Sequence, residues 1–323
     1  MKNDAVWVDA RITRTEMVAD GVRRIEFAAP SPLPAFDPGS HIAVRAAIAG
    51  GHAIRTYSCL PDAAPGHVAV AVKLHPNSRG GSRFMFGLVP GDQVRITTPQ
   101  NRFELSWRAP DYLLLAGGIG ITPILGMAAA LAGRGARVRV AYGGQSLDAM
   151  PFVEPLRVLL GDRLALYPQD QGSMIDLDAA IAGLSPDGEV YICGPLPMLE
   201  VAKSAWARAG RASSRFRYEV FGDTGRFTET PFTVRVAGYG VEVTVPPDRS
   251  LLDALDDAGI PMIHDCRRGE CGLCAVEVLD HQGPIDHRDV FLSDAEKREG
   301  TKLCACVSRI AGGHAVIDTG YRP

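Results

Sequence analysis

Three of the seven cysteines in the chain fall within one short stretch, Cys266-Arg267-Arg268-Gly269-Glu270-Cys271-Gly272-Leu273-Cys274. They stand at C-x4-C-x2-C spacing, which, with a fourth cysteine further along the chain, is a ligand pattern of [2Fe–2S] clusters. Two iron ions need four thiolates in one small volume, so a loop that supplies three of them must curl tightly. Gly269 and Gly272 stand where it has to bend, and glycine adopts positive φ without a steric penalty. The stretch therefore predicts a cluster-binding loop with Cys266, Cys271 and Cys274 as ligands.

The fourth ligand has two candidates, Cys304 and Cys306. If residues 302–309 form a strand, its side chains alternate and both thiols face the same side. The cysteine loop and this segment resemble plant-type ferredoxins and the C-terminal ferredoxin domain of the phthalate dioxygenase reductase family, in which the last ligand directly precedes a Val-Ser-Arg-like strand. The resemblance implies Cys306, whereas the loop spacing also allows Cys304.

Length and composition indicate an ordinary globular protein. The 323 residues suffice for two or three domains, and neither the net charge of −3 nor any basic run indicates nucleic acid. The N-terminus lacks the pattern of a signal peptide, and no apolar run approaches the ~18 residues that span a bilayer. An odd number of cysteines in a metal-like pattern argues against disulfides. We therefore expect a cytoplasmic protein that binds neither nucleic acid nor membrane.

The first third of the chain is expected to form an antiparallel β-barrel. Short runs rich in branched residues alternate with Pro and Gly clusters, which is typical of sandwiches and barrels; these runs are residues 6–13, 22–28, 41–48, 67–74 and 93–97. Within this region Tyr57 can pack on a flat ring, Ser58 can bond a ring nitrogen, and Arg55 can hold a phosphate in two hydrogen bonds. Further on, Gly80-Gly81-Ser82 opens a predicted short helix at residues 82–86, whose first N–H groups can bind an anion.

Alone, each motif also fits a solvated arginine, a core tyrosine or a plain glycine turn. Together, Arg55-Thr56-Tyr57-Ser58 and the segment from Asn77 to Phe84 resemble the flavin domain of the ferredoxin reductase superfamily. The resemblance implies flavin contacts from Arg55, Thr56, Tyr57, Ser58, Lys73, Gly81 and Ser82.

The middle third has the pattern of a parallel-sheet nucleotide-binding domain. Residues 112–116 are continuously apolar, as in a buried parallel strand, and Gly117-Gly118-Ile119-Gly120-Ile121-Thr122-Pro123 leads into an apolar helix. A helix that starts after a glycine loop can receive a pyrophosphate, with Thr122 as its N-cap and Pro123 in its first turn. Strand and helix signals then alternate, which predicts a parallel sheet; the helices include residues 150–160.

A second motif, Cys193-Gly194-Pro195-Leu196-Pro197-Met198, stands at the end of a later strand. With the first, it resembles the superfamily's nucleotide domain, which implies that Gly117, Gly118, Gly120, Thr122, Cys193, Gly194 and Pro195 contact the nucleotide. Where some relatives carry an arginine, this chain has Gly143-Gly144-Gln145-Ser146, so we expect NADH over NADPH. Asp170 borders this site or lies in a solvated turn. The family implies that Phe221 covers the flavin, although a core aromatic is the alternative.

The whole chain resembles the phthalate dioxygenase reductase and vanillate demethylase reductase family. We therefore predict a multidomain α/β and β protein with three parts: an FMN-binding antiparallel β-barrel at 1–108, a parallel-sheet NAD-binding α/β domain at 109–224, and a plant-type [2Fe–2S] ferredoxin domain of β-grasp-like fold at 231–323. FMN rests on the resemblance, because no side chain rules out FAD. In the third domain Ser250 is expected to cap a helix at residues 251–258.

The implied function is electron transfer. A nicotinamide delivers two electrons as hydride and a [2Fe–2S] cluster accepts one at a time, so a flavin must stand between them. The resemblance implies a monomeric, NADH-dependent reductase component for a separate Rieske-type terminal oxygenase that acts on an aromatic acid or similar small compound. Two alternatives stay open: a cytochrome P450 as acceptor, or a non-catalytic iron–sulfur electron-transfer or sensor subunit. Arg267 and Arg268 can steer an acidic docking face or simply be solvated.

Overall fold

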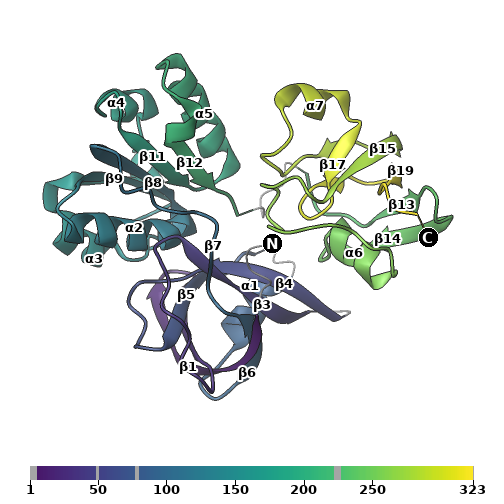
Figure 1. The fold of residues 1–323 in the computed structure, drawn as a ribbon, viewed down its shortest axis with the longest axis horizontal. Coiled ribbons are helices and arrows are strands. Elements are labelled where there is room, and N and C mark those ends of the chain that lie inside the picture. The colour runs from purple at the N-terminus through teal and green to yellow at the C-terminus, as the bar shows by residue number, and fades with distance from the viewer. Residues whose placement is uncertain (1–5, 49–50, 77–79, 222–226, 323) are drawn as a thin grey trace. The chain divides into compact units, whose positions relative to one another are not determined.

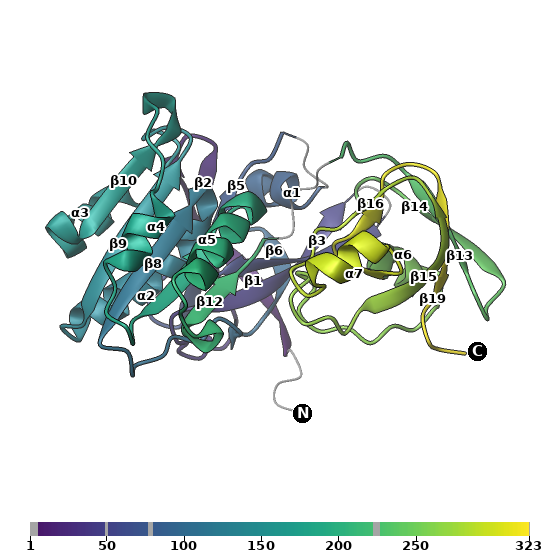
Figure 2. The ribbon, with the colours of Figure 1, turned by 90° about the horizontal axis from the view of Figure 1, so that it is seen from above.

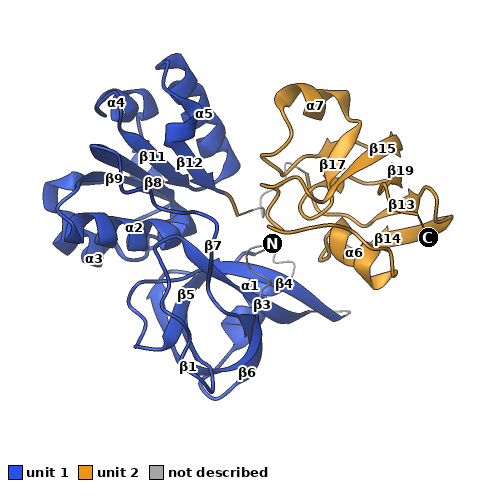
Figure 3. Cartoon of the chain, viewed as in Figure 1, with its two compact units in different colours: residues 1–219 blue, residues 220–323 orange. Residues whose placement is uncertain are grey.

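The computed structural model describes residues 6–48, 51–76, 80–221 and 227–322. The chain divides into two compact units, Met1–Glu219 and Val220–Pro323, which are coloured separately in Figure 3. Among the described residues, unit 1 contains two separate sheets, and unit 2 contains a five-stranded sheet and a two-stranded one. The finer boundaries expected from the sequence, at residues 108, 224 and 231, stay a prediction.

The first sheet of unit 1 is an antiparallel barrel (Figure 1). Its strands follow the order β4-β3-β6-β1-β2-β5, and β7 pairs with β3. An isolated bridge between Cys59 and Val70 joins the end of β4 to β5. Branched and aromatic side chains such as Ile25, Phe27 and Ile96 fill the interior. The strands are β1 Trp7–Ala19, β2 Val22–Ala28, β3 Ser40–Ile48, β4 Gly51–Ser58, β5 His67–Lys73, β6 Gln93–Thr97 and β7 Gln100–Asn101.

The second sheet of unit 1 is parallel throughout, in the order β10-β9-β8-β11-β12. Helices α2 and α3 cover one face, and α4 and α5 the other (Figures 1 and 2). The carboxyl ends of all five strands therefore meet at one edge, where α/β sheets bind their ligands. The elements are β8 Asp111–Gly117, α2 Ile121–Gly133, β9 Arg137–Gly144, α3 Val153–Leu160, β10 Leu164–Pro168, α4 Leu177–Ala182, β11 Glu189–Cys193, α5 Leu196–Arg208 and β12 Phe216–Glu219.

Two helix starts differ from the sequence prediction. Helix α3 begins at Val153 rather than at residue 150, because Phe152 has a left-handed backbone with φ 64°. Helix α2 has Gly120 as its N-cap, so the prediction of Thr122 as the cap is wrong. A 3₁₀ turn at Gly118–Gly120 runs directly into α2, which places Thr122 inside the first turn. There its hydroxyl donates to the carbonyl of Ile119 at 3.0 Å.

Unit 2 has a mixed sheet in the order β14-β13-β19-β15-β17. Strands β13 and β19 are parallel, and the other neighbours are antiparallel. Ser250 caps α6, as expected, by accepting the N–H of Asp253. The elements are β13 Phe232–Val236, β14 Val241–Val245, α6 Leu251–Asp257, β15 Ala275–Gln282, β16 Ile285–Asp286, α7 Asp294–Glu299, β17 Lys302–Cys304, β18 Arg309–Ile310 and β19 His314–Asp318; β16 and β18 pair with each other.

Of the helices that the structure describes, none combines the length and the apolar character needed to cross a membrane.

Candidate redox sites

The cysteine loop of unit 2 has the tight curl that its spacing predicts. Gly269 and Gly272 both have positive φ, 75° and 73°. A Cβ placed on Gly272 would lie 2.2 Å from the ring of Phe291, so any side chain at this position would force that ring to move. The bend predicted at these two glycines is confirmed.

The sulfur of Cys266 is surrounded by donors. The backbone N–H groups of Arg268, Glu270 and Cys271 each donate to it at 3.4 Å. The neighbouring thiols of Cys271 and Cys306, together with the N–H groups of Arg268 and Cys271, lower the pKa of Cys266. This environment favours a thiolate, which is the form that binds iron. The donor set therefore fits an iron–sulfur cluster.

The two candidates for the fourth ligand do not lie on one strand, because β17 ends at Cys304 and Cys306 follows in a turn. Both are buried. Cys306 perturbs the pKa of both Cys266 and Cys274, whereas the thiol of Cys304 acts most strongly with that of Cys274. Within the described ranges no three His, Cys, Asp or Glu side chains surround a position for a single metal ion. A [2Fe–2S] cluster instead shares four thiolates between two irons, and the position of Cys306 between two loop cysteines suits that set.

The two arginines of the loop do not present free charge to a partner. Arg267 pairs with Asp253 of α6 at 2.7 Å, and Arg268 pairs with Glu270 at 3.2 Å. Their side chains are only 16% and 5% exposed. Their guanidinium groups brace the loop, so the suggestion that the pair steers an acidic docking face is wrong.

The candidate flavin residues come together in unit 1. Arg55, Thr56, Tyr57 and Ser58 end β4, and Lys73 ends the neighbouring β5. The side chain of Arg55 lies across the start of helix α1 (Gly81–Gly87), since a Cβ on Gly81 would be 2.8 Å from its Cγ. Ser82 accepts the N–H of His75 at 3.3 Å. The arginine and the helix N-terminus expected to share a phosphate are thus adjacent, although residues 77–79 of the motif lie outside the described residues.

The two glycine motifs of the parallel sheet touch each other. They follow β8 and β11, which are neighbours. A Cβ on Gly120 would lie 2.2 Å from the carbonyl oxygen of Cys193, and one on Gly117 would lie 2.6 Å from Cδ of Pro195. Gly194 lies equally close, because a Cβ there would be 3.2 Å from Cα of Gly117. The predicted nucleotide residues therefore form one continuous backbone surface at the carboxyl edge of the sheet.

The next two loops along this edge are also joined. The carbonyl of Gln145, after β9, accepts the N–H of Asp170, after β10, at 3.0 Å. Asp170 was expected either to border the nucleotide site or to lie in a solvated turn, and the structure joins it to Gln145 of the segment that lacks the arginine.

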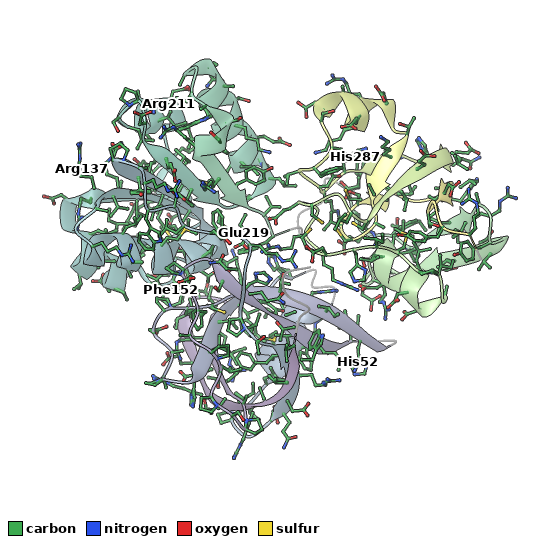
Figure 4. All side chains as sticks on the ribbon, viewed as in Figure 1. His52, Arg137, Phe152, Arg211, Glu219 and His287 are labelled. Carbon is green, nitrogen blue, oxygen red and sulfur yellow. The ribbon has the colours of Figure 1, made fainter. Side chains whose placement is uncertain are left out.

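Sequence reasoning missed Glu219, the last residue of β12, which is labelled in Figure 4. Its carboxylate is buried, and it accepts a hydrogen bond from the hydroxyl of Ser58 at 3.3 Å. In the sheet Glu219 stands opposite Cys193. Burial and the charge of Glu219 raise the pKa of the neighbouring Cys59. One acidic side chain thus links the candidate flavin strand to the candidate nicotinamide motif.

A sequence signal for Glu219 did exist. Glu219 ends a parallel strand next to the one that ends in Cys193, and the carboxyl ends of such strands are where α/β sheets place ligand-binding residues. Phe221, which was chosen instead, belongs to unit 2, and its role as a flavin cover stays a prediction.

Comparison with known proteins identifies the domains. Residues 9–105 match the oxidoreductase FAD-binding domain, and residues 234–311 match the 2Fe-2S iron-sulfur cluster binding domain. A putative toluene-4-sulfonate monooxygenase system reductase subunit from Comamonas testosteroni is 35% identical, with 96% of this chain and 98% of that protein covered. Phthalate dioxygenase reductase from Burkholderia cepacia is 33% identical, with 95% of this chain and 96% of that protein covered.

Solved structures agree. The structure of phthalate dioxygenase reductase, described as modular for electron transfer from pyridine nucleotides to [2Fe-2S], has a TM-score of 0.80 and 32% identity, and covers 97% of this chain and 98% of that one. An intact type IV self-sufficient cytochrome P450 monooxygenase matches with a TM-score of 0.67 and 32% identity over 96% of this chain and 41% of that one. The fold, the domain matches and the relatives agree that this chain is a member of the phthalate dioxygenase reductase family, an NADH-dependent oxidoreductase with a flavin and a [2Fe–2S] cluster.

Proposed function

We propose that this chain is the reductase component of a multicomponent oxygenase and that it carries electrons from NADH through FMN to its cluster. The observation that carries the proposal is the continuity of the site in unit 1. Ser58 of the flavin strand bonds Glu219, and Glu219 stands opposite Cys193 of the nucleotide motif. A flavin accepts hydride and releases single electrons, so the task of the protein is to hold the cofactors in position.

The residues divide this task. Arg55 and the start of α1 would hold the flavin phosphate, with Lys73, Gly81 and Ser82 around it, while Thr56, Tyr57 and Ser58 would contact the ring. The backbone of Gly117, Gly118, Gly120, Gly194 and Pro195, beside Thr122 and Cys193, would hold the nicotinamide nucleotide. Phe221 would cover the flavin. Cys266, Cys271, Cys274 and Cys306 would hold the cluster, because Cys306 lies beside two of the loop thiols, those of Cys266 and Cys274.

The position of Asp170 supports a preference for NADH over NADPH. Asp170 is fixed beside Gln145 through its own N–H. A carboxylate there suits a ribose hydroxyl and repels a 2′-phosphate. The Asp170→Asn variant should therefore lose part of the preference for NADH, measured as the ratio of kcat/KM for the two nucleotides.

The proposed acceptor is a separate terminal oxygenase of Rieske type that acts on an aromatic acid or similar small compound. The relatives named as reductase subunits of monooxygenase and dioxygenase systems support it. A second candidate acceptor is a cytochrome P450, because the P450 monooxygenase structure contains a segment like this whole chain. We propose that the reductase itself is a monomer.

The test is an anaerobic titration with NADH. Purified, flavin-loaded protein should lose its flavin and iron–sulfur absorption bands together and gain a rhombic one-electron EPR signal. Acid extraction and mass spectrometry should find FMN and no FAD. Bleaching of the flavin alone would remove the cluster from the pathway. A protein that keeps both cofactors and is not reduced by NADH would be a non-catalytic sensor or electron-transfer subunit.

A further inference from the structure

Glu270 lies inside the cysteine loop, directly before Cys271. Its side chain accepts the backbone N–H of Val220 at 2.9 Å, across fifty positions of sequence. Val220 is the first residue of unit 2 and is 1% exposed. Its peptide bond connects it to Glu219, the buried carboxylate that bonds Ser58 in unit 1. The chain therefore enters unit 2 attached to the loop that carries the thiols.

The carboxylate of Glu270 is held from its other side. Its second oxygen lies 3.2 Å from the guanidinium of Arg268, whose side chain is 5% exposed. Glu270 itself is largely buried, with 19% of its side chain exposed. A paired and hydrogen-bonded carboxylate in such surroundings has a defined position, so it can fix the backbone that it accepts.

The backbone of Glu270 also reaches the thiols. Its N–H donates to the sulfur of Cys266 at 3.4 Å, as does the N–H of Arg268. Hydrogen bonds to ligand sulfurs belong to the environment that sets a cluster's properties. One residue thus touches Cys266 through its main chain and Val220 through its side chain.

From these contacts we infer that Glu270 is a positioning residue for electron transfer from flavin to cluster, because it attaches the chain directly after Glu219 to the cluster loop. This inference rests on the proposed electron path. The hydrogen bond ties the cluster loop to Val220, the residue that follows Glu219 in the chain, and electron transfer slows steeply with distance. Glu270 touches no substrate, so hydride transfer to the flavin should not depend on it.

The test compares three variants at this position in the full-length protein with both cofactors. Glu270→Ala removes the acceptor, and Glu270→Asp keeps the charge but is one methylene too short to reach Val220. Glu270→Gln keeps an oxygen that can accept the same N–H. Glu277→Ala, which removes an exposed carboxylate on β15, is the matched control.

The first readout is hydrogen–deuterium exchange at the Val220 amide, which does not depend on activity. Loss of a hydrogen bond to a charged group should speed exchange about tenfold or more in the Ala and Asp variants, while the Gln and Glu277→Ala proteins stay protected. The second readout is anaerobic stopped-flow absorbance with NADH. Cluster reduction should slow about tenfold in the same two variants, with the rate of flavin reduction unchanged.

Iron content and EPR spin counts establish that each variant carries its cluster; if the Ala protein loses it, the Asp protein provides the same comparison. An unchanged exchange rate at Val220, or cluster reduction as fast as in wild type despite faster exchange, would overturn the inference. A wild-type protein whose flavin is reduced while its cluster never is would instead overturn the proposed function.

Discussion

Removal of the Glu219 carboxylate should slow the reduction of the flavin by NADH. The hydroxyl of Ser58 donates to Glu219 at 3.3 Å in a buried setting. A hydrogen bond to a charged group contributes about 1.5–3 kcal/mol, and each 1.36 kcal/mol corresponds to about tenfold in rate. Because 3.3 Å is long for such a bond, the lower end applies. We expect Glu219→Ala to slow hydride transfer about tenfold.

The assay is anaerobic stopped-flow at the flavin band, with Ser58→Ala and the Ser58→Ala/Glu219→Ala double variant measured beside it. Two residues that act through one shared bond should not have additive effects, so the double variant should be little slower than either single one. Glu189→Ala is the matched control. Glu189 is also a buried carboxylate that accepts a hydroxyl hydrogen bond, but it is the first residue of β11 and so lies at the opposite end of that strand from Cys193.

Two results would refute this reasoning. In the first, NADH reduces the flavin of Glu219→Ala no more slowly than that of Glu189→Ala, which would mean that any slowing comes from a general loss of packing. In the second, the two single effects multiply fully in the double variant, so that Ser58 and Glu219 act independently.

Three further predictions concern the cysteines, the loop glycine and a buried acid. Cys306→Ser should lose the cluster while Cys304→Ser keeps it, measured as iron and acid-labile sulfide per flavin; the reverse pattern would make Cys304 the ligand. Gly272→Ala should lower cluster occupancy, because its Cβ would meet the ring of Phe291, whereas Gly259→Ala, at an almost equal φ of 74° with open space around it, should keep the cluster and lose only about 1–2 kcal/mol of stability. The pKa of Glu26 is lowered, since hydrogen bonds from His67 and Arg24 outweigh the opposing effect of burial. The charged carboxylate therefore stabilises the fold above its unfolded pKa near 4.5, and this stabilisation is lost as the pH falls below that value. As the pH is lowered through this region, the urea midpoint of the wild-type protein should drop more steeply than that of Glu26→Gln.

Local patterns made much of the fold predictable. Strands such as Val22–Ala28 and Gln93–Thr97 have the bounds expected from the sequence, because branched and apolar runs between turn residues leave few alternatives. The cluster loop was predictable for the same reason, since its spacing and its two glycines are local features. The predicted cap Ser250 also depends on a neighbour three residues away.

The features that sequence reasoning missed depend on distant partners. Glu219 and Ser58 are 161 positions apart, and nothing local tells a buried carboxylate from a solvated one. Arg267 was expected either to steer an acidic docking face or to be solvated, because its partner, Asp253, lies on a helix whose packing the loop sequence does not show. Thr122 was given the cap because the 3₁₀ turn before α2, which moves the helix start to Ile121, has no signal of its own.

The nucleotide site and the cluster loop make different demands on their residues, so substitutions in the two sites should impair different half-reactions. At the nucleotide edge the contacts are backbone to backbone, as where Gly120 approaches Cys193, so an added side chain there should block NADH without disturbing the thiols of unit 2. At the cluster loop, thiols and N–H donors surround Cys266, so a lesion should remove the cluster and leave flavin reduction intact. Since the cofactors carry the electron chemistry, a protein that only positions them should lose the two half-reactions separately. A substitution in the cysteine loop that abolished hydride transfer as well would mean that the sites are coupled by more than position.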